Sequence, residues 1–102
     1  MSDCKTFYVY PTMIDGLRAS IAWVNSNPRY RRRVGYPQYE ATSMLARMER
    51  VGAYHCYREG VMSARVVFQF MLKVSNLTCE TDTRRLASSG AYNLNDQMNN
   101  RF

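Results

Sequence analysis

The sequence predicts an α+β fold, in which two helices pack on a small, mainly antiparallel sheet and an irregular C-terminal tail follows. Three observations lead to this prediction. Two segments repeat apolar residues at helical spacing, later segments alternate as strands do, and the last 28 residues are rich in Asn, Ser, Thr and Asp. We therefore expect an α+β domain over residues 1–74 and an extended polar tail over residues 75–102.

The N-terminal part predicts one strand and one helix. Residues 6–10 are β-branched or aromatic and end at Pro11, which favours a short strand or an extended arm. Thr12 is a suitable N-cap, with Asp15 three residues later, and we expect the helix to run to about Ser26. Its apolar residues follow the spacing of one helical face: Ile14, Leu17, Ile21 and Val24.

A basic loop and a second helix are expected next. Pro28 cannot continue the first helix, and residues 34–37 are expected to be extended up to the second proline, Pro37. The second helix closes at Gly52, a residue that readily adopts the left-handed C-cap. Its apolar face is formed by Ala41, Met44, Leu45, Met48 and Val51.

Two strands are predicted after this helix, over residues 53–59 and 64–74, joined near Gly60. The second strand alternates, with one apolar face formed by Val66, Phe68, Phe70 and Leu72. The tail from residue 75 shows no sustained apolar period, so we expect it to become ordered only on a partner. Its candidate anchors are Leu86, Leu94, Met98 and Phe102.

Composition restricts the class of protein. A chain of 102 residues, 46% of them hydrophobic, forms one globular domain, and no apolar run approaches the ~20 residues of a membrane span. The N-terminus resembles no secretory signal, and Asp3 argues against an acid-poor transit peptide. The three cysteines are widely spaced and form no metal-binding motif, which favours a reducing compartment and predicts no metal site.

Positive charge is concentrated in one region. Residues 29–65 hold eight arginines and three glutamates, a net charge of +5 in a chain whose formal net charge is +6. Arginine pairs bidentately with phosphate and a tyrosine can stack on a base, so the run predicts a nucleic-acid contact rather than a solvated loop. The expected RNA-binding residues are Arg29, Tyr30 (stacking or packing), Arg31, Arg32 and Arg33, with Arg58, Arg65, Arg84 and Arg85 behind them.

Catalysis has little support in the sequence. His55 is the only histidine, and its neighbour Cys56 would point to the opposite face of a strand, so the two cannot form a dyad. No known catalytic or phosphate-loop motif occurs. We expect no enzyme, no cofactor and no small-molecule substrate. Trp23 is expected either to widen the core or to anchor another chain.

Three consecutive segments carry a family resemblance: residues 34–37, the helix ending at residues 44–52, and residues 53–57. Their order resembles the N-terminal half of the small-subunit ribosomal protein number eight family, over residues 12–74. Two features depart from that family. Residues 38–40 replace a serine and a basic residue after the proline, and the family's Ser-Thr-Ser-x-Gly loop is missing, because residues 88–90 are too short a match.

The resemblance implies a structural constituent of a small ribosomal subunit, binding ribosomal RNA and neighbouring ribosomal proteins, with no membrane association. It also implies a mitochondrial ribosome, with the cytoplasm as the alternative. Two other classes share some of the features. One is a winged-helix DNA-binding protein, since a helix followed by a Tyr-rich hairpin is typical of that fold. The other is a small phage-type interaction or inhibitor protein.

Overall fold

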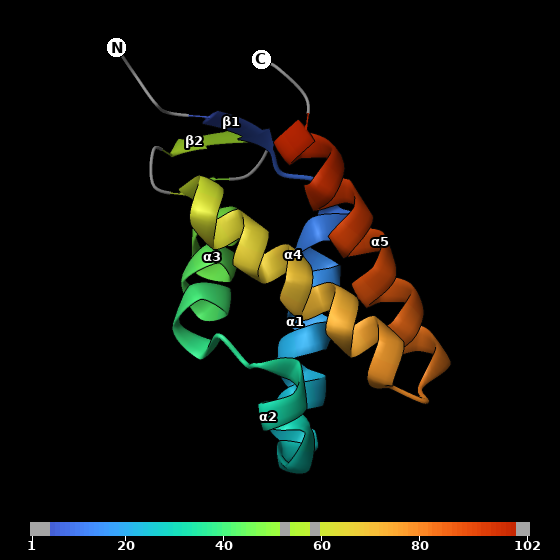
Figure 1. Ribbon diagram of the computed structural model, residues 1–102. Coiled ribbons are helices and arrows are strands. Elements are labelled where there is room, and N and C mark those ends of the chain that lie inside the picture. The colour runs from blue at the N-terminus through green and yellow to red at the C-terminus, as the bar shows by residue number, and fades with distance from the viewer. Residues whose placement is uncertain (1–4, 52–53, 58–59, 100–102) are drawn as a thin grey trace.

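A computed structural model describes residues 5–51, 54–57 and 60–99 of the chain. Within these ranges the protein is an elongated helical bundle of 43 × 23 × 22 Å (Figure 1). Its helices are α1 (Pro11–Ser26), the 3-10 turn η1 (Pro28–Tyr30), α2 (Arg31–Val34), α3 (Gln38–Val51), α4 (Gly60–Leu77) and α5 (Thr81–Asn99). Two short strands complete the described part, β1 (Lys5–Tyr8) and β2 (Tyr54–Tyr57).

The prediction of helices packed on a sheet is wrong. The sheet in the described residues consists of β1 and β2 alone, antiparallel, with Lys5 opposite Tyr57 and Tyr8 opposite Tyr54. This pair lies at one end of the molecule, beside the start of α4 and the end of α5 (Figure 1). The core is built from helices, and the predicted helices over residues 12–26 and 41–51 coincide with α1 and α3.

Residues 64–74, predicted as a strand, belong to α4. The segment is almost continuously apolar, so its side chains satisfy the period of a strand and that of a helix equally well. Its buried positions are spaced three or four residues apart, as on one helical face: Ala64, Val67, Phe70, Met71 and Val74. The domain boundary drawn after residue 74 falls inside this helix.

The irregular tail is also a wrong prediction, because most of residues 75–102 form α5. This helix packs along α1 and α4, and these two contacts are the most extensive between elements (Figure 1). Its buried residues are Ala87, Gly90, Ala91, Leu94, Gln97 and Met98, and the alanines and glycine among them carry little hydrophobic signal. Of the four expected anchors for a partner, Leu94 and Met98 are buried in the protein's own core, Leu86 is half-buried, and Phe102 lies outside the described residues.

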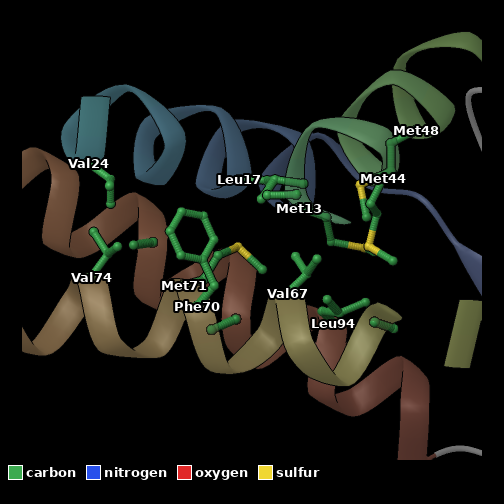
Figure 2. Close-up of a cluster of buried hydrophobic side chains, with 14 of the residues drawn as sticks. Met13, Leu17, Val24, Met44, Met48, Val67, Phe70, Met71, Val74 and Leu94 are labelled. Carbon is green, nitrogen blue, oxygen red and sulfur yellow. The ribbon is translucent and has the colours of Figure 1, made fainter. Parts of the chain in front are cut away.

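Figure 2 shows the core, where side chains from four helices converge. Helix α1 contributes Met13 and Leu17, α3 contributes Met44, α4 contributes Phe70, and α5 contributes Leu94, each no more than 3% exposed. Methionines fill irregular gaps between helices because their side chains are unbranched and flexible. The methionines of α3 therefore serve packing, as their spacing predicted.

Helices α1 and α5 approach closely at a pair of glycines, Gly16 and Gly90. A Cβ on Gly16 would lie 2.8 Å from the Cα of Gly90 and 2.5 Å from the carbonyl oxygen of Leu86. Ser20, buried one turn later, donates a hydrogen bond of 2.8 Å to the carbonyl oxygen of Gly16. The two backbones therefore touch with no room for a side chain between them.

The N-cap of α1 lies two residues before the predicted one, at Tyr10 and not at Thr12. The first helical residue is Pro11, and the side chain of Tyr10 makes no capping hydrogen bond. Proline is favoured at the first helical position because its missing N–H would have no partner there. The hydroxyl of Thr12 instead accepts a hydrogen bond of 2.9 Å from the side-chain amide of Asn93, which adds a polar tie between α1 and α5.

Candidate nucleic-acid interface

The arginine run forms a compact projection that we call the arginine knob, residues 28–35. It consists of η1, α2 and Gly35, and it lies at the end of α1 opposite the β1–β2 pair (Figure 1). Residues 34–37 were predicted to be extended, and this is wrong because Val34 ends α2. Proline at residue 28 starts the 3-10 turn, since its fixed φ suits the first position of a helix.

Backbone hydrogen bonds close the knob. Gly35 has φ 64° and ψ 56°, the left-handed conformation in which glycine carries no steric penalty. Its N–H donates to the carbonyl of Arg32 at 3.2 Å, and the N–H of Tyr36 donates to the carbonyl of Arg31 at 3.1 Å. This pair of bonds is a Schellman motif, which ends a helix while satisfying its last carbonyl groups. The motif fixes the backbone that carries the arginines.

Aromatic packing attaches the knob to the core. The ring of Tyr36 stacks on Phe70 of α4, with centroids 5.3 Å apart and planes 10° apart. The ring of Tyr30 packs on Trp23 of α1 with centroids 5.2 Å apart. Trp23 is only 6% exposed, so of its two expected roles the structure shows core packing. Val34 is buried as well. The contacts of Tyr30, Val34 and Tyr36 therefore hold the knob against the helices of the core.

The four arginines of the knob are exposed, and within the described residues none of them forms an ion pair with a carboxylate. Three of them lie over aromatic rings instead. The guanidinium carbons of Arg29 and Arg33 are 5.0 and 5.6 Å from the centroid of Tyr30, and that of Arg31 is 5.8 Å from the centroid of Tyr36. Such cation–π contacts orient a guanidinium group without neutralising its charge.

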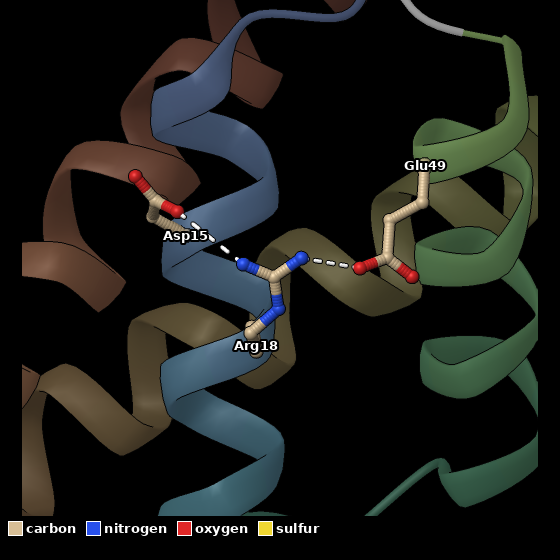
Figure 3. A network of polar contacts seen from close by, with 3 residues as sticks. All are labelled: Asp15, Arg18 and Glu49. Atoms are coloured by element: carbon tan, nitrogen blue, oxygen red, sulfur yellow. Dashed lines mark hydrogen bonds and ion pairs between the residues drawn. The ribbon is translucent and has the colours of Figure 1, made fainter.

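Other arginines have polar partners inside the protein. Arg18 bridges two helices, because it pairs with Asp15 on α1 at 3.6 Å and with Glu49 on α3 (Figure 3). At the start of α5, Arg84 donates a 2.7 Å hydrogen bond to the carbonyl oxygen of Thr78. Arg84 therefore satisfies a backbone acceptor just beyond α4.

Among the described residues, none of the other predicted RNA-binding arginines belongs to the knob. Arg85 lies on the first turn of α5, 4.0 Å from Asp82, and Arg65 is exposed on α4. Arg58 lies outside the described residues. The structure adds one cation, Lys73, which no sequence pattern connects with the knob. The Nζ atom of Lys73 on α4 lies 4.0 Å from the position a Cβ would take on Gly35.

The structure changes the expected role of Tyr30. Its ring is covered by Trp23 and by two guanidinium groups, and its hydroxyl lies 3.5 Å from Nη2 of Arg29. The sequence left stacking and packing open, and the geometry shows packing. In the sequence, the packing of Tyr30 could be inferred only from its spacing from Trp23. That spacing is uninformative unless the chain is known to turn at Pro28.

The described residues contain neither a candidate metal site nor a helix suited to span a membrane. Among the residues described by the structure, no group of three or more His, Cys, Asp or Glu side chains could hold a metal ion. In the same part of the chain, no helix combines the length and the apolarity needed to cross a bilayer. The side chains of His55 and Cys56 lie outside those that the structure describes.

Comparison with protein-family models, with curated proteins and with solved structures finds no match to this chain.

Proposed function

We propose that the protein binds the phosphate backbone of RNA through the arginine knob, as a structural component of a ribonucleoprotein with no catalytic turnover. One observation carries the proposal: four exposed arginines stand on a fixed turn, and none is paired with a carboxylate of the described chain. Guanidinium groups match the geometry of phosphate oxygens and release counterions when they bind.

The rigidity of the knob supports this function. A flexible arginine loses side-chain entropy when it binds, and prior orientation on an aromatic ring reduces that loss. Arg29, Arg31 and Arg33 are oriented in this way by the rings of Tyr30 and Tyr36. Tyr30 acts in this proposal as a positioning residue and not as the surface on which a base stacks.

The proposal draws on the knob and not on the family resemblance. The small ribosomal subunit, with ribosomal RNA and ribosomal proteins as partners in a mitochondrial or cytoplasmic ribosome, stays a prediction from sequence. That prediction loses one support, because residues 64–74 form a helix where the resemblance requires a strand. The winged-helix alternative is weakened for the same reason, because the predicted hairpin needs a strand over residues 64–74. A basic knob also suits duplex DNA phosphates, so nucleic-acid preference separates these classes.

The test compares arginine-to-alanine substitutions inside the knob with the same substitutions outside it. Replacing Arg31, Arg32 and Arg33 by Ala should weaken binding to a structured RNA and lower the salt dependence. Each lost phosphate contact reduces the slope of log K against log salt by roughly 0.7 to 0.9. The double variant Arg65→Ala, Arg85→Ala removes two predicted RNA-binding arginines that lie outside the knob and should weaken binding much less than the triple variant, and an equal loss would show that the RNA site is not confined to the knob.

Stability is measured alongside, because each exposed arginine should alter the free energy of unfolding by no more than ~0.5 kcal/mol. If the triple variant binds RNA as wild type does across the salt titration, the knob is not the RNA site. Competition with duplex DNA addresses the alternative. Stronger binding to DNA, with affinity that changes when major-groove bases are altered, would favour a DNA-binding protein.

A further inference from the structure

One tyrosine beside the knob is almost fully exposed. Tyr39 lies on the first turn of α3 and is 80% exposed, more than any other large hydrophobic side chain in the described residues. Only three residues separate it from Gly35, the end of the knob, so its Cα lies within ~14 Å of that glycine. Tyrosine combines an apolar ring with a polar hydroxyl, a combination that is enriched at interfaces.

The exposed face of α3 continues away from Tyr39. Residues three, seven and eleven positions later lie on the same side of the helix, and all are exposed: Thr42, Ala46 and Arg50. Arg50 forms no ion pair within the described residues and lies about 16 Å along the helix from Tyr39. The opposite face is buried in the core through Met44 and Met48. We call this exposed face, from Tyr39 to Arg50, the α3 track. Its aromatic ring lies between the positive charge of the knob and that of Arg50.

The acidic residues of α3 do not block this track. Glu49 points toward α1, where Arg18 binds its carboxylate (Figure 3). Glu40 is half-buried in the first turn of the helix. The surface beside Tyr39 thus carries no fully exposed carboxylate that is left without a cation, among the residues described on α3.

The other exposed tyrosines lack this setting. Tyr8 and Tyr10 stack on each other, with centroids 6.3 Å apart. Tyr92 on α5 is 57% exposed, but the residues three and four positions from it are Ser88, Ser89, Asn95 and Asp96. The nearest cation on the same side of that helix is Arg85, seven positions earlier, and it faces Asp82 at 4.0 Å, whereas Arg50 forms no ion pair within the described residues. Tyr92 is consequently a matched control, a tyrosine exposed on a helix without a neighbouring phosphate site.

We propose, resting on the RNA-binding function above, that an unpaired RNA strand leaves the arginine knob and follows the exposed face of α3. Tyr39 stacks on one of its bases, and Arg50 binds a later phosphate. A positively charged path with an aromatic ring along it is how proteins hold single strands, because every base has a face that can stack. The proposal assigns an unpaired segment of the RNA to α3 and the adjoining phosphates to the knob.

The experiment measures wild type, Tyr39→Ala, Tyr39→Phe and Tyr92→Ala. Each is titrated with a short unstructured RNA and with a blunt RNA duplex of the same sequence. A base contact by stacking is lost with the ring, so Tyr39→Ala should weaken binding to the unpaired strand about tenfold and leave the duplex unchanged. Tyr39→Phe should bind as wild type, since its ring is retained, and Tyr92→Ala should show no change on either RNA.

A second readout reports the stack itself. Placing 2-aminopurine at single positions of the unpaired strand should show fluorescence quenched by wild type and by Tyr39→Phe, but not by Tyr39→Ala. Circular dichroism confirms that each variant is folded, as expected for an exposed side chain. If Tyr39→Ala matches Tyr92→Ala on the unpaired strand, or weakens the duplex equally, the stacking proposal is overturned while RNA binding stands. Wild type that binds neither RNA overturns both proposals.

Discussion

The crossing of α1 and α5 and the arginine knob each depend on a glycine, for opposite reasons. At the crossing, a Cβ on Gly16 would meet the backbone of α5, 2.8 Å from the Cα of Gly90. At the knob, a Cβ on Gly35 would meet only the end of a lysine side chain at 4.0 Å, but the residue has φ 64°. One position is closed to a side chain by lack of space, the other by backbone conformation.

This difference separates two regions of the molecule. The crossing of α1 and α5 determines stability, whereas the arginines of the knob can be replaced without disturbing the fold. The crossing is buried, and any added atom must displace backbone, which costs packing along two helices. The knob is exposed, and its arginines can be replaced with little effect on the fold. The proposed function and the stability of the fold therefore depend on different residues, and variants can test them separately.

The largest effect is expected from shortening α5. Deleting residues 91–102 removes Leu94 and Met98 from the core, and each large buried side chain contributes on the order of 2 to 5 kcal/mol. Their sum approaches the whole stability of a small domain, so cooperative thermal unfolding should be lost. Tyr92→Ala, an exposed change in the same helix, should leave the melting temperature nearly unchanged. A truncated protein that melted like wild type would instead make this segment a docking tail.

A smaller but still large effect is expected from Gly16→Ala. Glycine to alanine in a helix usually stabilises by about 1 kcal/mol, but here the added methyl group overlaps Leu86 and Gly90 of α5. We expect a net loss of about 2 kcal/mol in a urea titration. Ala22→Gly, at an exposed position of α1, measures the propensity contribution alone. Unchanged or increased stability of Gly16→Ala would show that the two helices do not touch at this point.

The smallest effect concerns the knob. Gly35→Ala places a Cβ in the left-handed region and should reduce the free energy of unfolding by about 1 kcal/mol. Gly35→Asn should lose less, because asparagine tolerates this conformation better. The comparison between the two variants, by chemical denaturation, isolates the conformational cost from steric overlap. Equal losses for both would mean that contacts, and not φ, decide this position.

Part of the candidate site was predictable from sequence. Arg29 and residues 31–33 were expected on the surface, since unpaired charge is not buried, and the structure places them there. The sequence does not decide whether Tyr30 stacks on a base or packs in the protein, because its contact with Trp23 depends on how sharply the chain turns at Pro28. Tyr39 was not singled out, since a single exposed aromatic residue on a helix has no sequence signature.

The sequence by itself determined the amphipathic helices α1 and α3, whose apolar residues repeat at one spacing, and the position of the basic cluster. Only the tertiary structure decided the conformation of residues 64–74 and of α5. An almost continuous apolar segment fits strand and helix alike, and it becomes a helix here because α1, α3 and α5 pack against it. The small buried residues of α5 favour burial only where another backbone comes close, and Gly16 of α1 provides that approach.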